Sequence, residues 1–309
     1  MRLMITGGAG FIGSNLTRHA LHEGHDVRVL DDLSTGRLDN LAGLGIDLIE
    51  GSILDQRVVD AAMAGVDAVV HLGAIPSVPR SVAAPRASHD ANATGTLNVL
   101  EGARNAGVGH VSVASSSSVY GANPKLPKSE FDYTRPMSPY AVSKLATEGY
   151  ALAYQFSYGL PTLAFRFFNV YGPGQPADHD YAAVIPKFVE AALRGRPVTV
   201  HGDGTQSRDF TYVQTVCRVL LDAAVRGVAS SEPVNLAYQS NTNLLELLAL
   251  LENLLGHPID REFTEPRVGD VRASQADCSR VRELFGDVQP VSLEDGLAET
   301  VAWLKGAVR

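Results

Sequence analysis

A glycine-rich stretch near the amino terminus constrains the fold more than any other part of the sequence. A short apolar run at residues 2–6 is followed at once by Gly8, Gly10 and Gly13, and then by a helix-like stretch to His22. This is the G-x-G-x-x-G spacing in its strand, turn and helix context. Small residues let the backbone approach a pyrophosphate, and the helix N-terminus supplies N–H donors. The stretch predicts a dinucleotide site, the alternative being a glycine turn without a ligand.

The next strand carries an acidic residue at the position that selects the cofactor. We expect a strand at Val27–Leu30, which ends in Asp31 about 20 residues beyond the fingerprint, where an acid binds the adenosine ribose. A carboxylate there repels a 2′-phosphate. The sequence therefore favours NAD over NADP.

Apolar strands then alternate with helical or loop segments. Further strands are expected near residues 46–50, 67–71, 109–114 and 161–166. Continuous apolar strands interleaved with helices indicate a parallel sheet that is covered on both faces. The predicted fold class is therefore α/β, a Rossmann-type doubly wound parallel sheet, with an NAD-binding domain over residues 1–171.

The sequence becomes less regular after residue 171. Residues 172–309 are predicted to be mainly a smaller α/β substrate-binding domain, with some exchange of chain between the two domains. The elements expected there are helices near 184–195, 213–226, 243–256 and 293–305, and short strands near 198–201 and 209–212. Two arginines follow loop signals, Arg208 and Arg267, and arginine suits bidentate phosphate contacts.

Tyr140 and Lys144 are the candidate proton-transfer pair. They lie four residues apart at the start of an expected helix and would project from the same face. A free tyrosine titrates near pKa ~10. We expect Lys144 and an oxidised nicotinamide to lower the pKa of Tyr140 toward the range of a general base. The serine run at residues 115–118 follows the fifth strand and is either a polar turn or the source of a hydroxyl beside the phenol.

Composition and charge exclude several functional classes. The net charge of −8 contains no basic block, which argues against nucleic-acid or anionic-membrane surfaces. No apolar run approaches the ~20 residues of a membrane span. Cys217 and Cys278 are far apart without metal-ligand spacing, so we expect no metal and no disulfide framework, and a cytoplasmic location.

Four motifs together resemble the extended short-chain dehydrogenase/reductase family, and within it the NAD-dependent nucleotide-sugar 4-epimerases of the UDP-glucose 4-epimerase type. The motifs are residues 6–13, the SSSSVYG run at 115–121, Tyr140-x-x-x-Lys144 and the RFFNVYGP run at 166–173. The resemblance covers nearly the whole chain. It implies tightly held NAD, a UDP-sugar substrate and a homodimer formed through two helices per subunit.

The resemblance also implies residue roles. Tyr140 would be the catalytic base, Lys144 its pKa-lowering partner and ribose ligand, and Ser116 the hydroxyl near the sugar O4. Hydride would pass to NAD and return to the other face of a 4-keto sugar, without net oxidation. The cofactor residues would be Gly7, Gly10, Phe11, Ile12, Gly13, Asp31, Asp32, Ser34, Thr35, Gly36, Ser52, Ile53, Leu72, Gly73, Ala74, Tyr140, Lys144 and Phe168. The substrate residues would be Ser77, Ser116, Tyr140, Asn169, Val184, Lys187, Phe188, Arg208, Arg267, Asp270 and Ser274.

Other activities occur on the same fold, and a few positions separate them. Sugar 4,6-dehydratases resemble this chain but carry an Asp-Glu pair where Ser117 and Ser118 stand. UDP-glucuronate 4-epimerases often have Thr in place of Asn169, which makes a neutral hexose the better match. Ser274 stands where some epimerases have a bulky Tyr, and a small side chain leaves room for an N-acetyl group. A net oxidoreductase and an NAD-sensing regulator stay open as alternatives.

An apolar helix supports the expected dimer. The stretch from Ala141 to Tyr158 carries apolar and aromatic residues around much of its circumference, including Tyr150 and Phe156. A helix that is apolar on more than one side needs a second burial partner. Burial within one large domain is the alternative.

Overall fold

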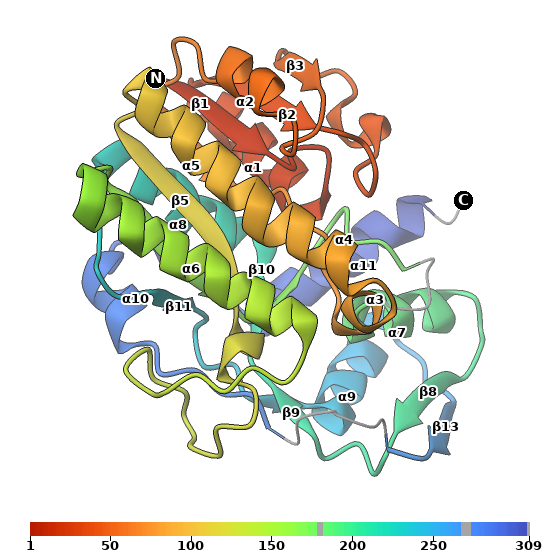
Figure 1. Ribbon diagram of the computed structural model, residues 1–309. Coiled ribbons are helices and arrows are strands. Elements are labelled where there is room, and N and C mark those ends of the chain that lie inside the picture. Colours follow the sequence, from red (N-terminus) through yellow and green to blue (C-terminus); the bar gives the residue numbers. More distant parts are fainter. Residues whose placement is uncertain (178–181, 267–272, 308–309) are drawn as a thin grey trace.

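Seven parallel strands form the central sheet of the protein (Figure 1). The computed structural model describes residues 1–177, 182–266 and 273–307. The strand order is β11-β6-β5-β4-β1-β2-β3, and every neighbouring pair is parallel. The strands are β1 (Arg2–Thr6), β2 (Asp26–Asp31), β3 (Asp47–Glu50), β4 (Ala68–His71), β5 (His110–Ser116), β6 (Thr162–Phe167) and β11 (Val234–Leu236).

Helices cover both faces of this sheet. Helices α1 (Phe11–His22) and α8 (Val213–Arg226) pack on one face, while α2 (Gln56–Ala62), α5 (Gly95–Ala106) and α6 (Pro139–Tyr158) cover the other (Figure 1). Successive side chains of β1 point to opposite faces of the sheet: Leu3 and Ile5 pack in the hydrophobic core on one face, and Met4 packs in the core on the other. The predicted doubly wound α/β fold is confirmed.

Local signals set the ends of the two helices that matter most for the site. The Ser138 hydroxyl accepts a hydrogen bond from the Ala141 N–H, and Pro139 occupies the first turn of α6. Helix α6 ends at Gly159, whose φ of 69° is the left-handed conformation that favours glycine. These signals place Tyr140 and Lys144 in the first turns of α6.

Most of the remaining elements lie beside the carboxyl ends of the strands, although one short helix at residues 279–284 packs beside β11. Two-stranded pairs join β7 (Asn169–Tyr171) to β10 (Phe210–Tyr212), β8 (Val198–His201) to β13 (Arg261–Thr264), and β9 (Ser207–Arg208) to β12 (Thr242–Asn243). The other helices are α3 (Val78–Ala83), α4 (Pro85–His89), α7 (Val184–Leu193), α9 (Leu244–Leu255), α10 (Ser279–Leu284) and α11 (Leu293–Ala307). The short turns are η1 (Leu38–Leu41), the π-type η2 (Asp90–Thr94) and η3 (Ser117–Tyr120).

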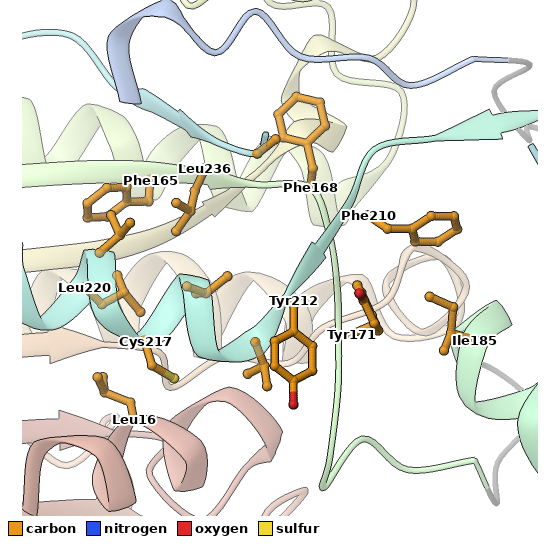
Figure 2. Close-up of a cluster of buried hydrophobic side chains, with 14 of the residues drawn as sticks. Leu16, Phe165, Phe168, Tyr171, Ile185, Phe210, Tyr212, Cys217, Leu220 and Leu236 are labelled. Carbon is orange, nitrogen blue, oxygen red and sulfur yellow. The ribbon is translucent and has the colours of Figure 1, made fainter. Parts of the chain in front are cut away.

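One continuous core joins the sheet to these elements. Figure 2 shows Cys217 and Leu220 of α8 lying between Leu16 of α1 and the strand residues Phe165 and Leu236. The same cluster continues through Tyr171, Phe210 and Tyr212 to Ile185 of α7. This shared core fixes the substrate-side elements to the nucleotide-binding sheet.

The structure refines several predicted elements. The expected strand at 209–212 is two short strands, β9 and β10, interrupted at Asp209. Strand β11 was missed, and it shows that the carboxy-terminal half supplies one strand to the central sheet. The domain division at residue 171 stays a prediction. Within the described ranges, none of the helices is both long and apolar enough to span a bilayer.

Candidate active site

A cavity of about 1020 Å³ runs along the carboxyl ends of the central strands. This is where ligands of doubly wound sheets bind. Every residue of the predicted cofactor set lines it except Gly36. Gly36 packs instead against Ala9 and the Asp31 carboxylate, where an added Cβ would lie 2.8 and 2.9 Å from their atoms.

The glycine fingerprint has no room for side chains. A Cβ on Gly13 would lie 2.2 Å from the Gly7 carbonyl oxygen and 2.7 Å from the Gly8 Cα, and Gly7 itself has a φ of +70°. The first turn of α1 is thus pressed against the end of β1 and opens on the cavity. The site fits a dinucleotide pyrophosphate, because the helix N-terminus there offers N–H donors and a partial positive charge.

Asp31 is held at the end of β2 by the backbone around it. Its two carboxylate oxygens accept hydrogen bonds from Ala9 N–H at 2.8 Å and Leu33 N–H at 2.9 Å. Burial raises the pKa of Asp31, and these backbone hydrogen bonds oppose the rise. The carboxylate lines the cavity, where it can accept from ribose hydroxyls as the sequence predicts.

Tyr140, Lys144 and Ser116 all line the same cavity. The Lys144 ammonium donates to the Ala114 carbonyl at 2.8 Å, and burial lowers the pKa of Lys144 to about 8. Burial raises the pKa of Tyr140, while its hydrogen bond with Ser116 opposes the rise. The net pKa of Tyr140 is thus raised, because desolvation of the phenol dominates. The lowering expected from Lys144 together with an oxidised nicotinamide stays a prediction.

The Ser116 hydroxyl is oriented by the turn that follows it. Ser116 caps η3, and its oxygen accepts from the Ser118 N–H at 3.2 Å and the Ser118 hydroxyl at 2.9 Å. With its oxygen accepting these bonds, the Ser116 proton is available to donate toward the Tyr140 oxygen. A donor at that place favours the phenolate form.

His71 lies beneath Lys144 as a neutral group. It is buried at the end of β4 between the Thr6 hydroxyl, 2.7 Å from Nδ1, and the Thr96 hydroxyl, 3.0 Å from Nε2. Burial and then the charge of Lys144 lower the pKa of His71 to about 3. Of His71 and Lys144, only Lys144 therefore carries a charge near neutral pH.

A second cavity of about 940 Å³ adjoins the first and shares Val170 and Ala183 with it. Its lining contains the predicted substrate residues Asn169, Val184, Lys187, Phe188 and Arg208. It also contains Arg194 and Arg196, which lie 3.0 and 3.8 Å from the Glu190 carboxylate. Basic side chains outnumber Glu190 in this lining, and this excess of positive charge suits the binding of a diphosphate.

The other predicted substrate residues have different outcomes. Ser77 lines the first cavity and has a φ of 97°, which is unusual for a residue with a side chain. Ser274 lines neither cavity, and its N–H donates to the carbonyl of Ser207, the residue before Arg208. Arg267 and Asp270 lie outside the described residues.

Some lining residues were not predicted. Arg37, Arg80 and Gln175 belong to the first cavity. Gln175 follows directly on the Gly172-Pro173-Gly174 turn, which is the signal that could have identified it. In the part of the chain that the structure describes, no three His, Cys, Asp or Glu side chains are arranged to hold a metal ion.

Comparisons with known proteins identify relatives that match nearly the whole chain. Residues 3–237 match the model of the "NAD dependent epimerase/dehydratase family". A UDP-glucose 4-epimerase of Mycolicibacterium smegmatis is 39% identical, and the alignment covers 99% of both chains. The UDP-glucose 4-epimerase of Thermotoga maritima, solved with UDP-glucose, has a TM-score of 0.94 and 35% identity over the full length of both chains.

A further solved structure is similar to the same degree. The UDP-N-acetylglucosamine 4-epimerase of Methanobrevibacter ruminantium, in complex with UDP-N-acetylmuramic acid, has a TM-score of 0.94 and 34% identity, with 99% of this chain and 98% of that chain covered. The predicted cofactor, NAD, agrees with the family description. This chain is therefore a member of the NAD-dependent epimerase/dehydratase family of short-chain dehydrogenase/reductase type.

Proposed function

We propose that the protein is an NAD-dependent 4-epimerase of UDP-hexoses, acting on UDP-glucose and UDP-galactose and also on their N-acetylamino counterparts. One observation carries the proposal. Ser116, Tyr140 and Lys144 line the dinucleotide cavity, and this cavity shares two lining residues with a second cavity that is rich in cations. The relatives named above support the same reaction.

The residues of the site divide the work between proton transfer and anchoring. Tyr140 in its phenolate form takes the proton of the sugar 4-hydroxyl and becomes the phenol. Before that transfer the Ser116 hydroxyl donates a hydrogen bond to the phenolate, and Lys144 supplies a nearby positive charge. The glycine turn and Asp31 would hold NAD, which when bound would supply a reversible hydride acceptor for the sugar C4. Lys187 and Arg208 hold the diphosphate in the second cavity. Firm anchoring of the diphosphate and weak contact with the hexose let the 4-keto ring present either face.

The dehydratase alternative lacks its acid and base. Water elimination needs carboxyl groups beside the sugar, and the positions after Ser116 are Ser117 and Ser118. The hydroxyl of Ser118 is already committed to Ser116 at 2.9 Å. We therefore infer epimerisation in preference to elimination.

Proton NMR of the purified protein tests the proposal directly. The protein is incubated with UDP-galactose and, separately, with UDP-GalNAc, without added cofactor. Appearance of the gluco-configured anomeric signals supports 4-epimerisation with retained NAD. Unchanged sugars, or a 4-keto-6-deoxy product, would contradict it.

The comparison of the two sugars tests the substrate class. We propose that UDP-GalNAc turns over at least as fast as UDP-galactose, because the resemblance puts the small Ser274 where some epimerases have a bulky Tyr. Ser274 lines neither cavity, but its N–H contacts Ser207, the neighbour of Arg208 in the second cavity. The variant Ser274→Tyr should slow the N-acetyl substrate selectively, and Ser274→Ala is the matched control with the same backbone contact to Ser207. Intact N-acetyl activity in Ser274→Tyr would count against this gatekeeper role.

We also propose a homodimer through α6. Phe156 is 73% exposed and Tyr158 57% exposed on this helix, although seven other residues of α6 are buried. Light scattering should give twice the mass of one chain. Phe156→Glu should shift the protein toward monomer, whereas the same change at exposed Val225 of α8 should not.

A further inference from the structure

A buried ion pair lies one helical turn beyond Lys144. Glu148 follows Lys144 by four residues on α6, and Arg166 faces it from β6. The Arg166 Nε and Nη2 each donate to one Glu148 oxygen at 2.9 Å. The two side chains are only 5% and 9% exposed. This two-pronged contact has a fixed geometry, unlike a contact between a lysine and a carboxylate.

The carboxylate also holds the end of β5. The Ser115 hydroxyl donates a short hydrogen bond to Glu148 Oε1, and it lies 3.5 Å from the Lys144 carbonyl oxygen. Ser115 directly precedes Ser116. Glu148 therefore ties the backbone that carries the Ser116 hydroxyl to the turn of α6 that carries Lys144.

The Arg166 guanidinium contacts the segment that follows Ser116. Its central carbon, Cζ, lies 4.7 Å from the centre of the Tyr120 ring, and Tyr120 belongs to the η3 turn that Ser116 caps. The Tyr120 hydroxyl donates to Asn235 Oδ1 of β11 at 2.6 Å. Arg166 Nη1 also donates to the Glu130 carbonyl at 3.4 Å. Ser116 is thus fixed both before and after its position in the chain.

We propose that Glu148 and Arg166 are positioning residues that set the placement of the Ser116 hydroxyl against Tyr140. This inference rests on the proposed epimerase function. A buried ion pair often contributes little stability, since a protein with apolar residues of similar volume at both positions is often as stable as the protein with the pair, or more stable. The contribution of the Glu148–Arg166 pair here is to fix the position of the chain on both sides of Ser116. A misplacement of about 1 Å at a reacting group can cost about 10²-fold in rate.

The double variant Glu148→Leu/Arg166→Met separates positioning from stability. It replaces the pair by apolar side chains and leaves no unpaired charge. We expect a thermal midpoint at or above that of the wild type, unchanged NAD content and an unchanged KM, because the second cavity is not altered. We expect kcat to fall about 10²-fold. A double variant that is stable and keeps the wild-type kcat would overturn the proposal.

Serine variants in β5 provide a test that does not depend on the double variant folding. Ser115→Ala removes the link to Glu148 and should lower kcat at constant KM. Ser112→Ala is the matched control, since Ser112 is fully buried on the same strand and its hydroxyl has no partner among the described residues. Ser115→Ala with the activity of Ser112→Ala would overturn the proposal as well.

Amide hydrogen exchange distinguishes failure of this inference from failure of the proposed function. A wild type that is inactive on every UDP-hexose would refute the epimerase assignment. Faster exchange at residues 115–118 in Ser115→Ala than in Ser112→Ala would still support positioning. Equal exchange in the two variants would overturn it, whatever the reaction.

Discussion

Replacing Lys144 by methionine should abolish catalysis and yet stabilise the folded protein. Lys144 is 5% exposed, and burial lowers its pKa from the ordinary 10.5 to about 8. That difference of about 2.5 corresponds to about 3 kcal/mol against the native state at neutral pH, at roughly 1.4 kcal/mol per pKa unit. Loss of the hydrogen bond to Ala114 destabilises the variant by about 1 kcal/mol, which reduces this gain. We expect Lys144→Met to gain about 2 kcal/mol at pH 7.

The sign of the pH dependence makes the test sharp. Below about pH 8 the Lys144 amine is charged in both the folded and unfolded chain, so the native state carries the full cost of burial. As pH rises through about 8, the buried amine loses its proton while the unfolded chain keeps it until about 10.5. Wild-type stability from this group therefore rises, and the advantage of Lys144→Met shrinks toward pH 10.

Urea unfolding of nucleotide-free protein at about pH 7 and about pH 9.5 measures both quantities. Lys305→Met on α11 is the control, because Lys305 is exposed and the same chemical change there removes no buried charge. A Lys144→Met protein that is no more stable than wild type at pH 7 would refute the reasoning. So would a stability difference that does not change with pH.

Three further variants test other parts of the site. Gly13→Ala should lose NAD during purification, and its free energy of unfolding should fall by about 1–3 kcal/mol, because the added Cβ would lie 2.2 Å from the Gly7 oxygen. Full NAD content would contradict this. Tyr140→Phe should keep NAD but lower kcat about 10²- to 10⁴-fold, measured by single-turnover assay. Asp209→Asn should destabilise the protein by about 2 kcal/mol in urea, because its buried carboxylate accepts backbone N–H groups, including that of Gln239 at 3.1 Å.

Much of the fold could be predicted because its signals are local. The glycine spacing, the apolar runs of the first six strands and the acid at the end of β2 each depend on a few adjacent residues. The helix expected near 213–226 has the bounds of α8, and Gly227 ends it in the left-handed conformation. Tyr140 and Lys144 were placed together by helical spacing alone.

The parts that could not be predicted depend on distant contacts. Strand β11 has three residues and no periodicity of its own, and only its pairing with β6 makes it a strand. The Arg166 side chain belongs to a motif visible in the sequence, but its partner Glu148 lies 18 residues away. The raised pKa of Tyr140 follows from burial. Burial of a single side chain is set by the whole surrounding structure rather than by neighbours in sequence.

The position of β11 has a consequence for how the chain is made. A ribosome that has released the first six strands has not yet released the seventh, because β11 follows α7 and α8 in the chain. Until residues 234–236 emerge, β6 is an uncovered edge that can pair with another nascent chain. Domains usually fold in order as they emerge. Here the nucleotide-binding half has to wait for the second half, and slowing translation after residue 171 should increase aggregation of the nascent protein.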